Sequence, residues 1–501
     1  MINNQIANQL YRPSQVRELD RVAIEERGIP GFELMQRAGR AAFELLLECW
    51  PKPEKLHVFC GSGNNAGDGY VIAALAVRQG LPVQVIYLGD PQKLTGDAQL
   101  AYGHAIAAGV PCQPFGEDNS LQTGVVVDAL LGSGLHGSVR EPFGKAIRQI
   151  NSSQLPVLAV DIPSGLCGDS GAELGLAVQA DATVSFIGHK RGLFTGRGPA
   201  LCGEVFFDSL DVPADIYQSQ QPVAQLLEYD RLRQQFPPRR RDAHKGDFGH
   251  LMVIGGDSGM GGAVMLAAEA ALRCGAGLVS VATRPEHVPA LLARRPEVMA
   301  LGVNSGQELV QHLAKPTVLV IGPGLGQSPW SQQLLQAALG CDLPMLLDAD
   351  ALNLLAQGPL SFSSHNNDRV ITPHPGEAAR LLGVETAALQ KDRFSAAQQL
   401  VNQTGAVTVL KGAGTLVCDG ENTTICTAGN PGMASGGMGD VLSGVIGALL
   451  AQGLAPMDAA QLSVYLHAAA ADKVAEQQGE LGMIASDLFQ PLRDLFNEGT
   501  G

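Results

Sequence analysis

Residues 430–444 read NPGMASGGMGDVLSG, and the end of this stretch opens an apolar run over residues 441–450. Glycines ahead of an apolar helix indicate backbone that approaches a neighbour closely or takes positive φ. The unpaired N–H groups and the dipole of such a helix start favour an anion. Asp440 falls in the first turn, where we expect the helix dipole to keep its carboxylate charged at neutral pH. A phosphate cradle beside a base suits phosphoryl transfer.

The alternative for this stretch is a glycine-rich turn that caps a buried helix, with Asp440 as an ordinary N-terminal charge. The length of the string favours a site. ASGGMGDVLSG resembles the G-x-G-D signature of ribokinase-like enzymes, and specifically that of the NAD(P)H-hydrate dehydratases.

Composition limits the class of protein. A chain of 501 residues should hold two or more domains, and 45% apolar with 17% charged residues indicates a globular protein. The net charge of −15 disfavours nucleic acid and anionic membrane as partners. Any phosphate-bearing ligand must therefore be held by local glycine loops and a few cations.

Cysteine usage and the N-terminus predict a cytoplasmic protein. The nine cysteines are scattered without a C-x-x-C pair, which argues against zinc and for reduced thiols. MINNQIANQL lacks the cationic start and apolar core of a signal peptide, and no run reaches the roughly 20 apolar residues of a membrane span. The sequence does not determine the oligomeric state, and it leaves a homo-oligomer open.

Strand and helix patterns alternate in both halves, which predicts mostly parallel sheets covered by helices. After two helices within residues 13–49, the expected strands of the first half are 56–60, 83–88, 125–127, 157–160, 183–187 and 205–207, with helices at 70–78 and 98–108. The second half has expected strands at 250–254, 278–282, 318–321, 345–347, 369–371 and 407–410, helices at 262–274 and 395–403, and a hairpin of 415–418 with 423–427.

The halves do not repeat one another, so we expect two different α/β domains, residues 1–216 and 243–501. Between them, residues 217–242 are polar and proline-rich and predict a linker. The run Arg239, Arg240 and Arg241 is interpreted as a solvated linker edge rather than a phosphate site.

Three loops of the first half follow strands, where an open α/β sheet binds its ligands. GSGNNAGDGY at 61–70 fits the dinucleotide fingerprint G-x-G-x-x-A, with Asp90 after the next strand, although a structural turn is the alternative. Its asparagine pair could bind a phosphate or ligate a hard cation. DALLGSG at 128–134 and DIPSGL at 161–166 each begin with an aspartate that alone would be read as a helix cap. The three loops together favour a site.

GNNAGDG, DALLGSGL and DIPSGLCGDSG resemble the NAD(P)H-hydrate epimerase family over residues 10–216, which implies a Rossmann-like α/β/α sandwich. The resemblance implies a potassium ion on Asn65, Asp128 and Ser164, and a catalytic Asp161 at the nicotinamide ring. The chain departs from the family at Ala66, where glycine is usual, and at Cys167, where aspartate is usual. The hydrate would contact Asn64, Asn65, Ala66, Gly67, Asp68, Gly132, Ser133, Gly134, Leu135, His136, Gly137, Ser138 and Asp161.

The second half carries three further loops at strand ends, GPGLG at 322–326, TPHPGE at 372–377 and KGAGT at 411–415. A structural histidine and a simple turn are the alternatives for the last two. No G-x-x-x-x-G-K-[ST] motif occurs, so the chain is not a P-loop enzyme.

Over residues 228–498 the resemblance to the dehydratase family implies a ribokinase-like α/β domain with Asp440 as the catalytic base. It implies Mg²⁺ and, from the fused architecture, ADP as co-substrate, although the residues do not separate ADP from ATP. The hydrate would contact Ala263, Gly326, His374 and Asp440. The adenine nucleotide would contact Lys411, Gly412, Ala413, Gly414, Thr415 and Gly439.

Together the two resemblances imply a bifunctional repair enzyme. Its first half would interconvert the R and S forms of hydrated NADH and NADPH, and its second half would dehydrate the S form with ADP, releasing AMP and phosphate. The alternatives are a small-molecule kinase fused to a non-catalytic nucleotide-binding module, and a first half that is only an interaction module.

Overall fold

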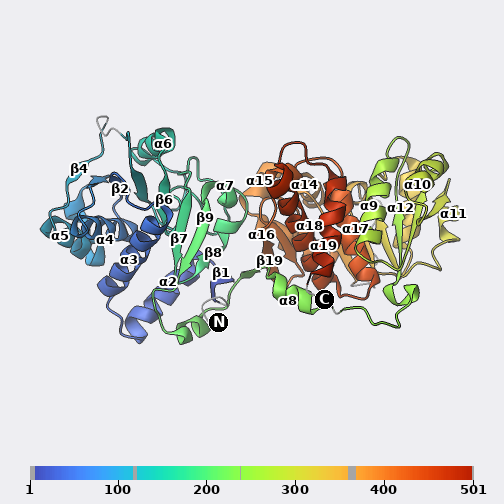
Figure 1. Ribbon diagram of the computed structural model, residues 1–501, viewed down its shortest axis with the longest axis horizontal. Coiled ribbons are helices and arrows are strands. Elements are labelled where there is room, and N and C mark those ends of the chain that lie inside the picture. Colours follow the sequence, from blue (N-terminus) through green and yellow to red (C-terminus); the bar gives the residue numbers. More distant parts are fainter. Residues whose placement is uncertain (1–5, 117–120, 237, 359–367, 499–501) are drawn as a thin grey trace. The chain divides into compact units, whose positions relative to one another are not determined.

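The computed structural model describes residues 6–116, 121–236, 238–358 and 368–498. The chain divides into two compact units, Met1–Gln225 and Leu226–Gly501 (Figure 1). Each unit is an α/β domain with its own hydrophobic core, as the alternating pattern predicts. Within the described residues, no helix combines the length and apolarity that a bilayer crossing requires.

The first unit is built on a parallel sheet with the strand order β4-β3-β2-β5-β6-β7-β9. Alternate residues of each strand face opposite sides: Val58 packs with α3, α4 and α5, and Phe59 packs with α6. These three layers confirm the predicted α/β/α sandwich. The bounds are α2 (Pro13–Arg21), α3 (Gly31–Cys49), β2 (Leu56–Cys60), α4 (Asn64–Arg78), β3 (Val83–Tyr87), α5 (Gly96–Ala107), β4 (Cys112–Pro114), β5 (Val125–Ala129), α6 (Phe143–Ser153), β6 (Val157–Val160), β7 (Ala182–Phe186), β8 (His189–Lys190), α7 (Gly198–Leu201) and β9 (Glu204–Asp208).

Helix α4 begins at Asn64, six residues before the predicted start, so the predicted glycine loop is wrong over most of its length. The reason is packing. A Cβ added to Gly67 would lie 2.4 Å from Met35 Sδ, and one added to Gly69 would lie 2.8 Å from the Cβ of Ala129. These glycines let α4 approach α3 and the sheet closely, and they do so in helical conformation.

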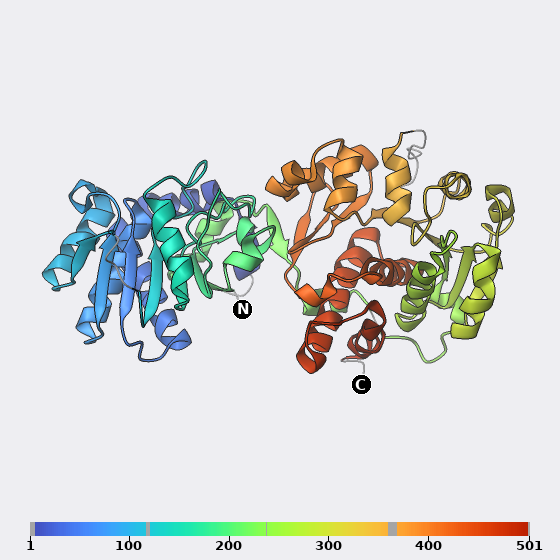
Figure 2. The same ribbon diagram turned by 90° about the horizontal axis from the view of Figure 1, so that it is seen from above.

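The second unit has the strand order β13-β12-β11-β14-β15-β16-β17-β18-β19, parallel as far as β17 and antiparallel beyond it. In Figure 2 the red helices α17–α19 and the orange helices α14–α16 lie on opposite sides of this sheet. Its strands are β11 (His250–Ile254), β12 (Leu278–Thr283), β13 (Met299–Gly302), β14 (Val318–Ile321), β15 (Met345–Leu347), β16 (Arg369–Ile371), β17 (Val407–Leu410), β18 (Thr415–Cys418) and β19 (Thr423–Cys426). Its helices include α9 (Gly261–Arg273), α10 (Val288–Arg294), α11 (Gly306–Val310), α12 (Pro329–Leu339), α13 (Ala349–Ala356), α14 (Pro375–Leu382), α15 (Thr386–Lys391), α16 (Arg393–Thr404), α17 (Met438–Ala451), α18 (Pro456–Gln478) and α19 (Phe489–Asn497).

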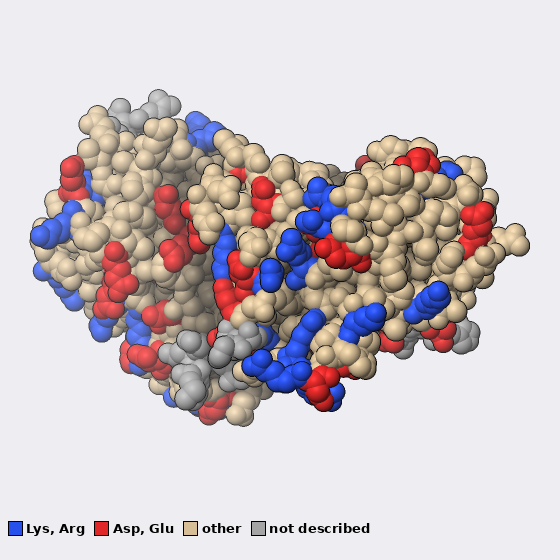
Figure 3. All heavy atoms as spheres, turned by 45° about the vertical axis from the view of Figure 1, so that its right-hand side comes forward, with Lys and Arg blue, Asp and Glu red and all other residues tan. Residues whose placement is uncertain are grey.

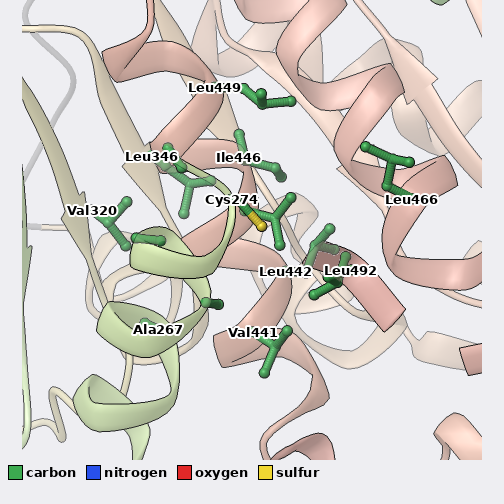
Figure 4. Packing of buried hydrophobic residues seen from close by; sticks show 14 of the residues in the cluster. Ala267, Cys274, Val320, Leu346, Val441, Leu442, Ile446, Leu449, Leu466 and Leu492 are labelled. Atoms are coloured by element: carbon green, nitrogen blue, oxygen red, sulfur yellow. The ribbon is translucent and has the colours of Figure 1, made fainter. Parts of the chain in front are cut away.

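Helix α17 is the centre of this unit's core. It is buried over its whole length from Val441 to Leu450, and its apolar side chains meet those of α9, β14, α18 and α19 (Figure 4). Contact with α9 requires a residue without a side chain, because a Cβ on Gly444 would lie 2.1 Å from the carbonyl oxygen of Ala267. The glycines of the deciding stretch therefore serve helix packing as well as the helix start.

The segment 217–242, predicted as a linker, contains part of η4 (Ala214–Ser219), then β10 (Ala224–Leu226) and α8 (Tyr229–Gln234); residue 237 lies outside the described part. Helix α8 is packed, since Leu232 is buried in the second core and Tyr229 stacks on Tyr465 with ring centroids 5.2 Å apart. The few apolar residues of α8 are enough to pack it against the second core. The polar average composition of the segment did not indicate this helix.

The arginine run within this segment belongs mostly to the surface. Arg239 lies over the ring of Phe248 at 3.6 Å, and the exposed Arg240 pairs with Asp242. On the face drawn in Figure 3, Lys and Arg side chains are interspersed with Asp and Glu.

We predict that Gly444→Ala lowers the free energy of unfolding of the second unit by about 1–3 kcal/mol, because helix α17 must separate from α9. Chemical denaturation measures this. Gly262→Ala is the matched control, because a Cβ at that helical position meets nothing within 4 Å. Equal stability of the two variants would contradict the packing role of Gly444.

Candidate functional site

The first candidate site lies at the carboxyl ends of β2, β5 and β6. Ser164 donates to both oxygens of Asp128, through Oγ at 2.6 Å and through its N–H at 2.8 Å. Both residues are fully buried, and burial raises the pKa of Asp128 to about 6 although these hydrogen bonds oppose the shift. Asn65 is also buried, and within the described residues neither atom of its amide has a hydrogen-bond partner. An unsatisfied buried amide indicates that something else completes this site.

The loop after β5 joins these groups to Asp161. The N–H of Leu131 donates to Ser164 Oγ at 2.8 Å, and that of Ser133 donates to Asp161 Oδ2 at 3.2 Å. A Cβ on Gly132 would lie 3.3 Å from Asn65 Cβ and 3.6 Å from Asp161 Oδ2. Asn65, Asp128, Gly132, Ser133, Asp161 and Ser164 are thus brought together.

The other residues predicted for this site have different surroundings. Ala66 and Gly67 are buried within α4, and Asn64 is exposed at its start. Farther along the loop, Leu135 is half-buried, whereas Gly134, His136, Gly137 and Ser138 are exposed.

Lys190 of β8 is a site residue that sequence reasoning missed. Its side chain is 1% exposed, and its ammonium donates to Asp161 Oδ1, to Ser185 Oγ at 3.2 Å and to the carbonyl of Phe186 at 3.3 Å. Asp161 itself has φ +69°, a left-handed conformation unusual for this residue type. No local motif marks Lys190, because its partner lies on a different loop.

Two more carboxyl groups surround this ion pair. Burial, with the charges of Asp161 and Asp20, holds the pKa of Asp68 well above its ordinary value. Burial and the Asp161 charge raise the pKa of Asp20 to about 6, and Lys190 opposes the shift. The site therefore combines one buried cation with three acidic groups, two of which retain protons more readily than usual.

The second candidate site lies where α17 begins. Gly437 takes φ +92° just before the helix, and Asp440 occupies its first turn. Burial and the nearby Asp348 carboxylate raise the pKa of Asp440 to about 7, against the attraction of Lys411. The expectation that the dipole keeps Asp440 fully charged at neutral pH is therefore wrong. Burial and a like charge outweigh the helix start.

Asp348, which follows β15, organises this site and was also missed. It is 1% exposed, and it accepts from Lys411 Nζ at 2.9 Å and from Ser443 Oγ at 2.8 Å. A Cβ on Gly439 would lie 3.4 Å from Lys411 Nζ and 3.6 Å from Asp348 Oδ2. The start of α17 therefore passes directly over the ion pair.

His374 caps helix α14 in this arrangement. Its Nδ1 accepts from the N–H groups of Gly376 and Glu377, so the ring proton must sit on Nε2, which faces Glu377 Oε1 at 3.2 Å. Burial, with the charges of Lys411 and Arg380, lowers the pKa of His374. Glu377 in turn lies 3.9 Å from Lys411. The structure thus links His374 to Asp440 through a chain of charged groups.

The loop from Lys411 to Gly414 is held from beneath by Arg393, another residue without a sequence signal. The Arg393 guanidinium is 1% exposed and donates to the carbonyls of Leu410, Lys411 and Gly414. Thr415 closes the turn by exchanging hydrogen bonds with Gly412. The loop is thereby fixed rather than free.

Ala263 and Gly326 lie at the ends of neighbouring strands. Ala263 is in the first turn of α9, and a Cβ on Gly324 would lie 3.0 Å from its methyl group. Gly326 takes φ +68° and donates its N–H to Asp350 Oδ2 at 2.9 Å. The same loop touches the second site at its other end, where a Cβ on Gly322 would strike the carbonyl of Asp348 at 1.8 Å.

Comparison with known proteins assigns each half. Residues 251–493 match the family model described as NAD(P)H-hydrate dehydratase, and residues 31–192 match that of the YjeF-related protein N-terminus. A solved ribokinase-like superfamily protein of Enterococcus faecalis covers 56% of this chain and is itself covered to 97%, with 30% identity and a TM-score of 0.52. The ADP/ATP-dependent NAD(P)H-hydrate dehydratase of Bacillus subtilis, co-crystallised with ATP and Mg²⁺, covers 56% of this chain and is covered to 99%, with 29% identity and a TM-score of 0.50. The second half is thus of the ribokinase-like class.

Full-length relatives carry both halves. The bifunctional NAD(P)H-hydrate repair enzyme Nnr of Coxiella burnetii is 50% identical over 97% of this chain and 99% of its own length. The protein of the same name from Escherichia coli is 44% identical over 98% of this chain and 95% of its own. The chain belongs to the family of bifunctional NAD(P)H-hydrate repair enzymes.

We predict that Lys190→Met destabilises the first unit by about 3–5 kcal/mol, because removing one partner of a buried ion pair leaves the other charge uncompensated. Chemical denaturation measures the loss. Lys93→Met is the control: it breaks the pair with Asp90, in which the lysine side chain is 84% exposed, and should change little. A loss below about 1 kcal/mol for Lys190→Met would contradict a structural role for the pair.

Proposed function

We propose that this chain repairs hydrated NADH and NADPH. Residues 1–216 interconvert the R and S epimers at C6, and residues 243–501 dehydrate the S epimer with ADP, yielding NAD(P)H, AMP and phosphate. The names of the full-length relatives support both activities. The observation that carries the second activity is Asp440 at the start of α17, close enough to the Asp348–Lys411 ion pair to feel both charges.

The chemistry of dehydration follows from these groups. Hydroxide is a poor leaving group, so the C6 hydroxyl is first phosphorylated. Asp440 takes the hydroxyl proton as the oxygen attacks the terminal phosphorus of the nucleotide, and AMP departs. Backbone N–H groups at 436–439 and the Lys411 ammonium stabilise the phosphoryl charge. The ring nitrogen then expels phosphate, and loss of a C5 proton restores the double bond.

The proposed reaction calls for Mg²⁺, which would come with the nucleotide. Among the described residues no group of three or more histidine, cysteine, aspartate or glutamate side chains is placed to hold a metal. Mg²⁺ would therefore be held mainly by the substrate phosphates, with Asp440 left free to act as the base. The ion would neutralise phosphate charge. ADP is the proposed donor, and Lys411–Thr415 with Gly439 form its site.

The epimerase half offers oxygens that suit a monovalent cation. The unpartnered amide of Asn65 supplies one neutral oxygen, and Asp128 and Ser164 supply a single charge and a hydroxyl. This sparse set is better matched to K⁺ than to a divalent ion. K⁺ there would fix the loop that carries Gly132 and Ser133 against Asp161. In this proposal Asp161, oriented by its ion pair with Lys190, acts at the nicotinamide ring.

The pH dependence of dehydration tests Asp440 as the base. A base works when deprotonated, so kcat on the S hydrate should rise with pH through about 7. Asp348→Asn removes a like charge, which lowers the pKa of Asp440 and moves the rise to lower pH. Asp440→Asn should keep ADP binding and lose about 10² to 10⁴ in kcat. A loss below about fivefold, with binding unchanged, would remove Asp440 from the mechanism.

The division of labour is tested with a mixture of both hydrate epimers, followed by NADH absorbance. Wild type should run to completion in one phase with Mg²⁺, K⁺ and ADP, or with ATP if the donor assignment is wrong. Asp161→Ala or Asp128→Ala should consume the S half and then stall at the rate of spontaneous epimerisation, because a misplaced hydroxyl cannot reach Asp440.

Two outcomes decide against the proposal. If Asp161→Ala still consumes both epimers in one fast phase, the first half has no epimerase role. If wild type accumulates a stable phosphorylated compound instead of orthophosphate, the second half is a small-molecule kinase.

A further inference from the structure

A polar cluster at the carboxyl ends of β11, β12 and β14 takes no part in the chemistry above. Its centre is Asp257, which is 8% exposed. The Asp257 carboxylate accepts from Arg284 Nε at 2.8 Å, from the N–H of Ser258 at 2.9 Å and from Ser328 Oγ at 2.7 Å. Although burial opposes it, the bonds from Ser328 and Arg284 lower the pKa of Asp257. The Asp257 carboxylate therefore holds its three hydrogen-bond donors in place and is not available to bind a ligand.

Asp257 and Trp330 together fix the orientation of the Arg284 guanidinium. Its guanidinium carbon lies 4.4 Å from the ring centroid of Trp330. Trp330 is 4% exposed and is fixed by its own bond from Nε1 to the carbonyl of Val303 at 2.9 Å. Salt bridge and stacking together remove most of the rotamer freedom of Arg284 before any ligand arrives.

The terminal nitrogens of Arg284 remain available. Within the described residues the only hydrogen bond of this side chain goes through Nε, so its two NH₂ groups have no partner. The side chain is 25% exposed, which gives a ligand access. A planar fork of free N–H groups is the geometry that binds phosphate in a bidentate manner.

The cluster adjoins the residues assigned to the hydrate. A Cβ on Gly326 would lie 3.0 Å from Asp257 Oδ2, and Ala263 follows on the first turn of α9. Both hydrates carry a diphosphate, and hydrated NADPH also carries a 2′-phosphate. We infer that the terminal nitrogens of Arg284 bind a phosphate group of the dinucleotide hydrate, an inference that rests on the proposed function.

One nearby acid opposes this binding. Glu286 is exposed and accepts from Ser258 Oγ at 3.1 Å. Its own backbone N–H, the Ser258 hydroxyl and the charges of His287 and Arg284 lower its pKa. Removing the Glu286 charge should therefore strengthen phosphate binding, which provides a variant of opposite sign.

Steady-state kinetics of the full chain test the inference. For Arg284→Met we expect KM for the S hydrate to rise about ten- to hundredfold, with KM for ADP unchanged. Arg284→Lys keeps the charge without the fork and should fall between, and Glu286→Gln should lower KM. A rise with both hydrates assigns the diphosphate, and a rise with NADPH hydrate alone assigns the 2′-phosphate. Unchanged KM for both would overturn the inference.

A binding measurement separates this inference from the proposed function. The chain has two tryptophans, so Trp50→Phe leaves Trp330 beside Arg284 as the only tryptophan, whose fluorescence can be excited selectively. Titration with inorganic pyrophosphate and with 2′-AMP should give a saturable change for at least one probe, which Arg284→Met abolishes. Identical titrations overturn the inference even if hydrate turns over. An Arg284-dependent signal without hydrate turnover supports the phosphate site and contradicts the proposed function.

Discussion

The second domain depends on a helix start laid over a buried ion pair. Asp348 and Lys411 come from the ends of β15 and β17, and the first turn of α17 crosses them at Gly439. One turn further on, Ser443 bonds the same carboxylate, so the helix is tied to the pair from two successive turns. Loss of either partner alone would leave the helix start and the loop after β17 beside an uncompensated buried charge.

Packing of helix α17 makes its contact with the Asp348–Lys411 pair rigid. The body of α17 is buried on every side, and Gly444 sits against the backbone of α9. A shift of the helix start would therefore have to move four surrounding elements of the core. Asp440 therefore has a fixed position, and the burial that fixes it also raises its pKa. The fixed position of the proposed base and the larger cause of its raised pKa thus both follow from the depth of the helix.

The central strands of both sheets were predictable because they are short apolar runs buried on both faces, as for 318–321 and 407–410, whose predicted bounds match β14 and β17. The partly exposed strands β4 and β13 were not predicted. The polar residues that complete the sites were not. Lys190, Asp348 and Arg393 are single residues whose partners lie on other loops, and no local pattern distinguishes them from solvated charges. The raised pKa of Asp440 was missed for a related reason: burial, the larger cause, and the charge of Asp348 at the end of another strand are both set by the fold rather than by the local motif.

The glycines explain why a motif predicts a fold better than it predicts ligand contacts. Gly437 and Gly326 take positive φ and shape loops, whereas Gly67 and Gly444 are helical and permit close packing. Glycines of both kinds occur in the same sequence motifs. Packing alone would therefore require most of the glycines in such a motif, whether or not a ligand binds there. What packing does not require is a carboxylate at the start of α17, since the helix would be buried equally well without it. The charged residues that the glycines surround therefore carry the functional information, and the glycines carry the geometry that brings them together.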